Sequence, residues 1–304
     1  MEHQITILPP NKIDAKKWDN CVAKNEVGLI YASSVYLNHM AKNWSGLVVD
    51  DYDGIMPLPW KKKFGVRYLY TPPFLQQLGL VGNQNITTSQ LEQAIQQYFK
   101  YGSYNLNFGN ISIAQQLIAK QKSNYIIDLN RNYEAIKSDY KKGFKANINT
   151  AKKQEYIYTA SHNFKEGIYL YRKYNAENLQ HVDDGEYEQL LSLCTALAAN
   201  NQLVVRNVID IRSDIQSIII LMKDTKRLYN IINYTSTKGR DNKANAFLYD
   251  NLFKEFAGTP ILFDFEGSDL TGVKAFYESF GSINQPYYQW HFNKLPWPLN
   301  WLKH

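Results

Sequence analysis

The sequence predicts an α+β protein that contains two copies of one unit. Shifting the chain by 157 positions brings six apolar pairs into register without a gap. Within each copy the first apolar residues recur every four positions, as on one face of a helix, and the next recur every two, as on one face of a strand. The aligned pairs are Leu91 and Leu248, Ile95 and Leu252, Phe99 and Phe256, Tyr104 and Ile261, Leu106 and Phe263, and Phe108 and Phe265.

The elements around these pairs also repeat. Each copy is preceded by a hairpin, formed by residues 46–49 with 55–60 in the first copy and by 215–222 with 227–234 in the second. Each copy continues through a polar turn into a second helix, at 111–122 or 271–280, and a last strand, at 125–129 or 287–292. The sequence therefore predicts two domains, at 1–130 and 131–304.

Two further segments complete the expected layout. Residues 61–85 form an inserted hairpin in the first domain and contain the motif Tyr70-Thr-Pro-Pro-Phe74. A basic helical segment near 141–153 precedes the second unit, with Lys141, Lys145 and Lys152 on one face. That face is either a solvated lysine surface or a binding surface, and the sequence leaves both alternatives open.

Composition limits the function. Apolar residues make up 44% of the 304 positions and charged residues 20%, as in a globular protein. Cys21 and Cys194 have no metal-ligand or disulfide spacing, and no signal sequence or bilayer-length apolar run is present, so a cytoplasmic location is expected. The net charge of +6 permits an anionic small molecule or carrier and does not by itself indicate DNA.

A strand, turn and helix near the C-terminal end suggest the chemistry. Ile261-Leu-Phe-Asp-Phe-Glu-Gly-Ser268 predicts a buried strand that ends in carboxylates, and a helix closing on Phe-Tyr-x-x-Phe-Gly follows. This arrangement resembles the second half of the GNAT acyltransferase core, and the whole chain resembles the Fem-type (FemAB-like) tandem GNAT proteins. The resemblance implies two GNAT-like (acyl-CoA N-acyltransferase) domains in tandem and an acyltransferase activity. The donor would be acyl-CoA or aminoacyl-tRNA, and the acceptor an amine on a sugar, lipid or cell-wall precursor.

The resemblance also implies a place for the donor's phosphates. GNAT folds hold them at the N-terminus of the helix after the fourth strand, where free N–H groups and the helix dipole favour anions. The matching segment here provides cations, hydroxyls and a flexible glycine, but it departs from the usual Arg/Gln-x-x-Gly-x-Gly/Ala pattern. The alternative is a polar helix cap. The expected donor-binding residues are Tyr234, Lys238, Gly239, Arg240, Asn242 and Lys243.

Three residues are candidates for proton transfer. Tyr277 occupies the position of the tyrosine that protonates the leaving thiolate in the GNAT superfamily. Asp264 and Glu266 lie two residues apart, so they are expected on the same face of one strand, with Glu266 as the base. The alternatives are a tyrosine that packs on the sheet and acids that cap a helix or pair with lysine. His162 and His181 are weaker candidates because they lie outside the repeat.

The predicted function is thus acyl transfer by the second domain, with the Tyr70-Thr-Pro-Pro-Phe74 segment of the first domain shaping the acceptor site. No tightly bound cofactor or metal is expected, and acyl-CoA or aminoacyl-tRNA would act as co-substrate. The alternative is a non-catalytic, degenerate tandem GNAT protein that binds an anionic or glycan ligand. A cleft beside Tyr277 filled by side chains would favour that alternative.

Overall fold

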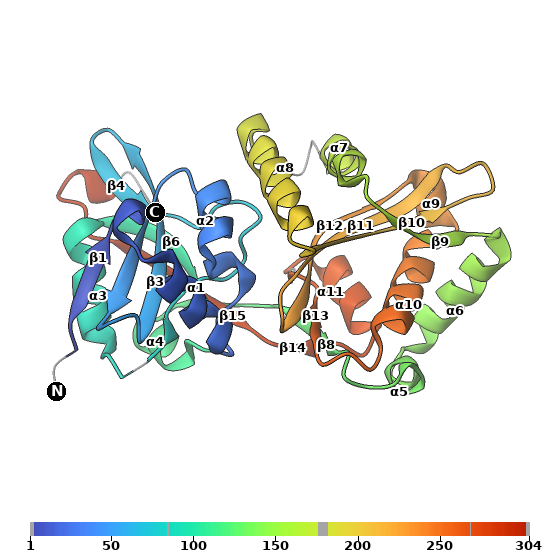
Figure 1. The fold of residues 1–304 in the computed structure, drawn as a ribbon, viewed down its shortest axis with the longest axis horizontal. Helices are drawn as coiled ribbons and strands as arrows, with labels where there is room; N and C mark the ends of the chain where they lie inside the picture. Colours follow the sequence, from blue (N-terminus) through green and yellow to red (C-terminus); the bar gives the residue numbers. More distant parts are fainter. Residues whose placement is uncertain (1–2, 84, 176–181, 268, 302–304) are drawn as a thin grey trace. The chain divides into compact units, whose positions relative to one another are not determined.

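The computed structural model describes residues 3–83, 85–175, 182–267 and 269–301 (Figure 1). The chain forms two compact units. Unit 1 contains residues 1–122 and 286–304, and unit 2 contains residues 123–285. Within the described ranges, no helix combines the length and the apolar character needed to cross a bilayer.

Unit 1 is a twisted sheet with helices packed on it. Its strands run in the order β1-β2-β3-β4-β6-β15-β7, and β5 adds to β3. The strands are β1 (Ile5–Leu8), β2 (Trp44–Val49), β3 (Gly54–Lys63), β4 (Val66–Leu69), β5 (Val81–Gly82), β6 (Tyr101–Leu106), β7 (Lys120–Lys122) and β15 (Tyr287–Asn293). The helices are η1 (Pro10–Lys12), α1 (Ala15–Lys24), η2 (Ile30–Ala32), α2 (Ser34–Met40), α3 (Thr88–Tyr98), α4 (Ile111–Gln116) and η4 (Leu299–Trp301).

Unit 2 repeats this plan. Its sheet has the order β14-β8-β13-β12-β11-β10-β9. The strands are β8 (Tyr125–Asp128), β9 (Ile157–Ser161), β10 (Leu203–Ile209), β11 (Ile215–Lys223), β12 (Arg227–Thr235), β13 (Leu262–Asp264) and β14 (Ile283–Asn284). The helices are α5 (Tyr133–Ser138), α6 (Lys142–Ala151), η3 (Lys152–Gln154), α7 (Phe164–Asn175), α8 (Asp184–Ala199), α9 (Thr237–Asp241), α10 (Ala244–Phe256) and α11 (Thr271–Glu278).

The two sheets correspond strand for strand. In each order given above, neighbouring strands are antiparallel except for one central parallel pair, β4 with β6 in unit 1 and β12 with β13 in unit 2. Leu91 lies in α3 and Leu248 in α10, the helices that cross over between these parallel strands. Both side chains are buried. The predicted α+β fold with two GNAT-like units in tandem is therefore confirmed.

The last strand of each sequence repeat belongs to the other unit's sheet. β8 follows the first repeat in the chain but pairs with β13 of unit 2, whereas β15 follows the second repeat and pairs with β6 of unit 1. The units therefore differ from the expected division at residue 130. Gly102 of β6 gives a local reason, because a Cβ there would lie 2.9 Å from the ring of Phe292. Trp290 and Phe292 of β15 are thus buried in the core of unit 1.

Two expected elements are also corrected. Residues 61–85 are not an inserted hairpin, because residues 61–63 complete β3 and residues 66–69 form β4, which is the counterpart of β12 and belongs to the repeat. The helix expected at 111–122 ends at Gln116, and Ile118 takes a left-handed φ of 52° before β7 begins at Lys120. Left-handed backbone is unfavourable inside a right-handed helix, so the chain turns there and adds a strand.

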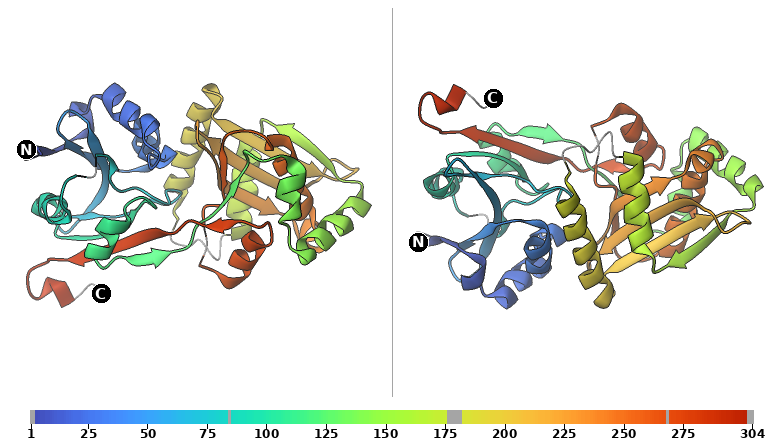
Figure 2. Two further views of the ribbon diagram at one scale, coloured as in Figure 1. Left: turned by 90° about the horizontal axis from the view of Figure 1, so that it is seen from below. Right: turned by 90° about the horizontal axis from the view of Figure 1, so that it is seen from above.

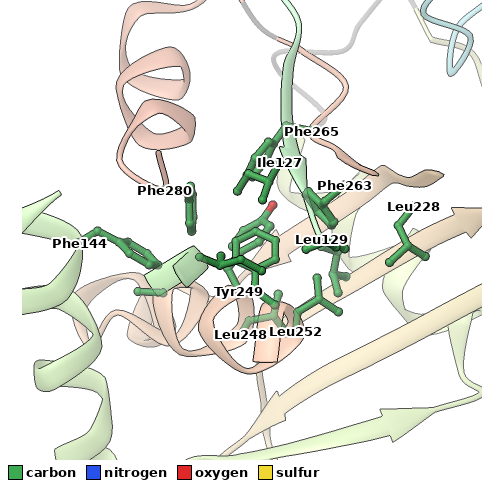
Figure 3. Close-up of a cluster of buried hydrophobic side chains, with 14 of the residues drawn as sticks. Ile127, Leu129, Phe144, Leu228, Leu248, Tyr249, Leu252, Phe263, Phe265 and Phe280 are labelled. Atoms are coloured by element: carbon green, nitrogen blue, oxygen red, sulfur yellow. The ribbon is translucent and has the colours of Figure 1, made fainter. Parts of the chain in front are cut away.

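The core of unit 2 is rich in aromatic side chains (Figure 3). Tyr249 of α10 lies among Phe253, Phe263, Phe265 and Phe280, with ring centroids 5.0 to 5.9 Å away. Each buried ring of this kind contributes about 1.5–3 kcal/mol of hydrophobic stabilisation. These contacts hold α10 and α11 against the sheet, while α7 and α8 cover its other face (Figures 1 and 2).

The expected basic helix is present as α6. Phe144, Ile148 and Ala151 are buried, and Phe144 lies 4.3 Å from Phe280 between ring centroids. Lys142 and Lys145 are exposed on the opposite side. The predicted amphipathic pattern is therefore confirmed, and the helix is part of the core of unit 2.

A buried ion pair lies where β12 and β13 meet. A guanidinium nitrogen of Arg227 is 2.7 Å from a carboxylate oxygen of Asp264, and the two side chains are 3% and 0% exposed. The other guanidinium nitrogen donates to Gln285 Oε1 at 2.8 Å. Removing one member of such a pair leaves an uncompensated charge in the interior.

We expect Arg227→Met to lower the free energy of unfolding by about 3–5 kcal/mol, because the variant keeps most of the side-chain volume but leaves the Asp264 carboxylate buried without its cation. Urea unfolding followed by circular dichroism would measure the change. The matched control is Lys137→Ala, which breaks an exposed pair with Glu134 and should cost under about 1 kcal/mol. Equal effects of the two substitutions would contradict this assignment.

Candidate functional site

β12 and β13 separate after a short parallel ladder. Their register pairs Arg227 with Leu262, Leu228 with Phe263 and Tyr229 with Asp264. β12 continues to Thr235 with β11 as its ladder partner, while β13 ends at Asp264. The ladder between β11 and β12 also shifts at this level, so that Ile231 is an extra residue between two paired ones. The two parallel strands therefore leave an opening beyond Tyr229 and Asp264.

A cavity of about 460 Å³ fills this opening. Its walls come from both faces of the sheet, because Tyr171 belongs to α7 while Tyr249 and Tyr277 belong to α10 and α11. The remaining lining residues are Asn230, Ile231, Asn233, Asn245, Phe265, Glu266, Gly267, Gly272, Val273 and Phe276. The cavity therefore combines an apolar aromatic wall with a few amide groups and one carboxyl group.

Glu266 is the carboxyl group of this cavity. It follows β13 with a left-handed φ of 65°, which turns its side chain away from the direction that strand alternation would give. Its Oε1 is buried and has no hydrogen-bond partner among the residues that the structure describes. Burial disfavours the ionised form and raises the pKa of Glu266 well above its ordinary value. Glu266 therefore stays protonated to a higher pH than an ordinary glutamate, and its carboxylate is a stronger base.

Tyr277 lies in the same cavity. Its ring stacks on Phe265, with centroids 4.5 Å apart and planes 30° apart. Burial raises the pKa of Tyr277, and the charge of Glu266 raises it further. The phenol therefore stays protonated at neutral pH and can donate a proton. The structure brings Glu266 and Tyr277 together, as expected of two groups that share a reaction.

Asp264 does not join them. The expectation of two carboxylates on one strand face fails because the strand ends at Asp264 and Glu266 lies in the turn beyond it. Asp264 is fully buried in the pair with Arg227, and its second oxygen accepts from the backbone N–H of Glu266 at 3.0 Å. It is outside the cavity lining. Its place in the structure is to hold the turn that carries Glu266.

A second pocket of about 360 Å³ adjoins the cavity and shares Asn233, Asn245 and Phe276 with it. Two of the expected donor-binding cations, Arg240 and Lys243, line this pocket. The other lining residues are Asn147, Tyr174, Thr235, Gly239 and Ala246.

Local contacts fix the groups of this second pocket. The Arg240 guanidinium lies 4.4 Å from the centroid of the Tyr174 ring and donates to the carbonyl of Thr235 at 2.8 Å. Gly239 is required at its position, because a Cβ there would lie 2.3 Å from the carbonyl oxygen of Gln216. The pocket thus presents a positioned guanidinium and an ammonium beside the reactive cavity, which suits a phosphate-bearing ligand.

The other expected donor-binding residues lie elsewhere. Lys238 forms an ion pair with Asp210 at 2.8 Å, and Asn242 and Tyr234 are not among the lining residues of either pocket. Lys243 has a left-handed φ of 64° just before α10. Lys243 thus has, three residues after Arg240, a left-handed backbone conformation that glycine adopts at no steric cost.

The corresponding opening in unit 1 is occupied by the chain itself. β4 and β6 pair at Tyr68 with Tyr101 and at Leu69 with Gly102. Beyond this point the backbone N–H of Leu78 donates to Asn105 O at 3.0 Å, and that of Gly79 donates to the Tyr104 hydroxyl at 2.8 Å. Residues 76–80 thus fill the space that is hollow in unit 2.

Several lining residues were missed by the sequence reasoning. Tyr171 and Tyr174 are three residues apart on α7, a helix outside the repeat, and their spacing on one helix face was an available signal. Burial raises the pKa of Tyr171 to about 12. Asn233 and Asn245 had no such signal. His162 is exposed before α7, and His181 lies outside the described residues. Over those residues, no cluster of His, Cys, Asp and Glu has the geometry of a metal site.

Comparison with known proteins supports the fold. No protein-family model and no curated protein matches this chain. The structure is similar to that of FemX, with a TM-score of 0.68 and 13% identity over 100% of both chains. It is also similar to a conserved protein of unknown function from Bacteroides thetaiotaomicron, with a TM-score of 0.61 and 14% identity over 95% of this chain and 100% of the other. L-PGS from Bacillus licheniformis gives a TM-score of 0.56 and 12% identity over 97% and 96% of the two chains. At these identities the likeness is one of fold, and the expected Fem-type tandem fold is confirmed.

The raised pKa of Glu266 predicts a pH-dependent stability. Between the ordinary carboxyl pKa and the raised value, the native state holds a proton that the unfolded chain has released, so the free energy of unfolding falls as pH rises. The Glu266→Gln variant has no group that ionises at this position, so its free energy of unfolding should not show this fall with rising pH. Its melting temperature should equal that of the wild type below about pH 4 and exceed it increasingly as pH rises.

Thermal unfolding over a pH series would measure this difference. The control is Glu188→Gln, which removes an exposed carboxyl of α8 and should leave the pH profile unchanged. A constant difference between Glu266→Gln and the wild type at every pH would show that Glu266 has an ordinary pKa.

The Lys243→Gly variant removes the ammonium charge of Lys243 while it keeps the left-handed backbone conformation at this position. Glycine adopts a positive φ without the cost of about 1–2 kcal/mol borne by other residues, which offsets the entropy that it loses on folding. The melting temperature should therefore stay close to that of the wild type, while the affinity for inorganic pyrophosphate falls several-fold. Calorimetric titration with pyrophosphate would measure this, with Lys173→Ala at an exposed site of α7 as the charge control. An unchanged affinity would remove Lys243 from the anion pocket.

Proposed function

We propose that this protein is an acyltransferase whose reaction takes place in the cavity between β12 and β13. The observation that carries the proposal is the pairing of Glu266 and Tyr277, a carboxyl and a phenol with raised pKa values, in one cavity beside a pocket lined by Arg240 and Lys243. Acyl transfer needs a base, an acid and an anion site for the donor. The fold shared with FemX and L-PGS supports the class of reaction by analogy.

The groups have the following roles in the proposal. Arg240 and Lys243 bind the phosphates of the donor. Its acyl carbonyl lies against the backbone of β12 at Ile231, which lines the cavity and has no ladder partner in the register, and the amide of Ile231 is the proposed oxyanion donor. The ionised Glu266 accepts the proton that the acceptor amine loses as nitrogen attacks the carbonyl carbon. Tyr277 gives its proton to the leaving group as the bond from the carbonyl carbon to that group breaks.

The direction of the Tyr277 pKa favours one class of donor. A thiolate leaving group has a conjugate pKa near 8.5, far below that of the buried phenol, so protonation of a thiolate by Tyr277 is uphill. An alkoxide leaving group is much more basic than a thiolate, so proton transfer from Tyr277 is more favourable for an oxygen ester than for a thioester. We therefore propose an oxygen ester on a phosphate-rich carrier, as in aminoacyl-tRNA, ahead of acyl-CoA.

The proposed acceptor is an amine on a sugar, lipid or cell-wall precursor. The apolar wall of the cavity, with Phe265 and Phe276, suits an acyl or aminoacyl group more than a highly charged acceptor. A structure with the same fold, at a TM-score of 0.54, is described as a domain of a putative lysylphosphatidylglycerol synthetase from Agrobacterium fabrum. This likeness supports aminoacyl transfer as the class and leaves the acceptor to experiment.

The non-catalytic alternative receives no support from the cavity. A degenerate binding protein was expected to have side chains filling the cleft beside Tyr277, whereas about 460 Å³ is hollow there. The binding function would return if no donor and acceptor pair reacted while an anionic ligand still bound to the pocket of Arg240 and Lys243.

We expect Tyr277→Phe to lower the single-turnover rate by roughly 100-fold, the range typical of removing a positioned acid, with donor affinity nearly unchanged because the ring remains. Donors would first be found by thermal stabilisation against aminoacyl-tRNA, free tRNA, acyl-CoA and CoA, since a ligand at about 100 times its dissociation constant adds about 2.7 kcal/mol.

The control is Tyr169→Phe, which removes a hydroxyl from an exposed tyrosine on α7 and should retain full activity. Full activity of Tyr277→Phe would refute the acid role. A larger loss with oxygen esters than with thioesters would support the argument from leaving-group basicity.

A further inference from the structure

The net charge of the protein resides entirely in unit 1. This unit contains fourteen Lys and Arg against eight Asp and Glu, a net charge of +6, whereas unit 2 contains twenty of each and is neutral. The proposed reaction site lies in unit 2. The net positive charge is therefore carried by residues other than Arg240 and Lys243 of the anion pocket.

The charge of unit 1 is also polarised along its sheet. Asp50, Asp51 and Asp53 lie in the turn between β2 and β3. The next turn along, between β3 and β4, is at the opposite end of the same strand and carries Lys62, Lys63 and Arg67. No Asp or Glu occurs from residue 54 to residue 91. The β2–β3 turn is thus acidic, and the end of the sheet at the β3–β4 turn is basic.

The basic end also exposes large aromatic side chains. Phe64 is 94% exposed at the apex of the β3–β4 hairpin, where Phe64 and Gly65 take φ values of 50° and 82° as in a tight two-residue turn. The Lys63 ammonium lies 5.5 Å from the centroid of its ring. An apolar ring at a protruding apex has no packing role within unit 1.

The sheet register brings further residues of this kind to the same end. β4 runs parallel to β6, and β6 runs antiparallel to β15, so the start of β6 and the end of β15 lie beside the hairpin. Lys100 directly precedes β6, and Lys294 directly follows β15. Trp297 and Trp301 then follow with 78% and 75% of their surface exposed.

We propose that this end of unit 1, formed by residues 61–67 and 294–301, docks on the surface of an anionic lipid bilayer. Phe64 and the two tryptophans would enter the interfacial region, and the lysines and Arg67 would lie among the lipid phosphates. Tryptophan and phenylalanine flanked by lysine is the combination that favours membrane interfaces, where aromatic rings bury and ammonium groups stay at the headgroups. Basic residues near such a surface each contribute an attraction that salt weakens.

A bilayer fits these features better than a nucleic acid does. Single-stranded nucleic acid is bound by grooves in which aromatic rings form stacking platforms along a backbone track. Here the rings stand on a hairpin apex and on the segment after β15, both of which lie at the ends of strands and not on a face of the sheet. A hairpin apex can enter a lipid headgroup layer, but it cannot enclose a nucleic-acid strand.

The test is co-sedimentation of the full chain with vesicles of pure phosphatidylcholine and with vesicles of equimolar phosphatidylcholine and phosphatidylglycerol. We expect binding to the anionic vesicles, weaker binding at high salt, and little binding to the neutral ones. Lys62→Ala combined with Lys63→Ala should lower the partition coefficient by roughly twentyfold. Phe64→Ser should lower it by roughly tenfold.

Two variants serve as matched controls. Lys16→Ala combined with Lys24→Ala makes the same change of charge on α1 of the same unit, and Ile211→Ser removes an apolar side chain that is 73% exposed in unit 2. Neither should alter vesicle binding by more than about twofold. Equal binding to both vesicle types, or equal effects of control and hairpin variants, would overturn the proposal. So would affinity for tRNA that the hairpin variants abolish while anionic vesicles fail to bind. No catalytic readout is used, so this result is independent of the proposed acyl transfer.

Discussion

The ion pair between Arg227 and Asp264 sets the point at which β12 and β13 separate. Two charges in the interior are tolerated only when each satisfies the other, and here the guanidinium also donates to Gln285 while Asp264 accepts from the backbone of Glu266. The pair thus joins the start of β12, the end of β13 and the turn after it. The position of the Glu266 carboxyl, and therefore the chemistry of the cavity, depends on this one buried contact.

The two units share one topology, but the gap between their parallel strands is filled by the chain in unit 1 and forms a cavity in unit 2. Both sheets have a parallel pair of strands that separates after a few residues, and in unit 1 residues 76–80 enter the gap and satisfy Asn105 and Tyr104. In the described part of unit 2 no segment enters the gap in this way, and Glu266 and Tyr277 line the space instead. In our proposals unit 2 therefore holds the reacting groups, and unit 1, which carries all of the net charge, docks on an anionic membrane surface.

Sequence periodicity predicted the α+β class, the tandem repeat and the amphipathic helix α6, because these depend on the spacing of apolar residues along one segment. It failed where the outcome depends on competition between segments. The apolar alternation along β15 would suit either sheet. The close packing of the Phe292 ring on Gly102, which has no side chain, is a tertiary contact that the local sequence pattern does not reveal. Glu266, Tyr277, Arg240 and Lys243 were expected from the sequence and line the cavity or the adjoining pocket, and their role in a reaction stays a prediction. Tyr171 and the asparagines come from elements that no local pattern ties to the cavity, and the left-handed turn at Glu266 separated it from Asp264.

The exchange of β8 and β15 has a consequence for how the protein is made. A ribosome releases the first 122 residues of unit 1 well before β15, and the whole of unit 2 is synthesised in between. Until Trp290 and Phe292 arrive, β6 lacks a neighbour and presents open backbone groups and an incomplete core. Unit 2, which receives β8 early, can complete its sheet first. The sheet of unit 1 therefore stays incomplete until all of unit 2 has been synthesised, and β6 is exposed to misassociation during that time.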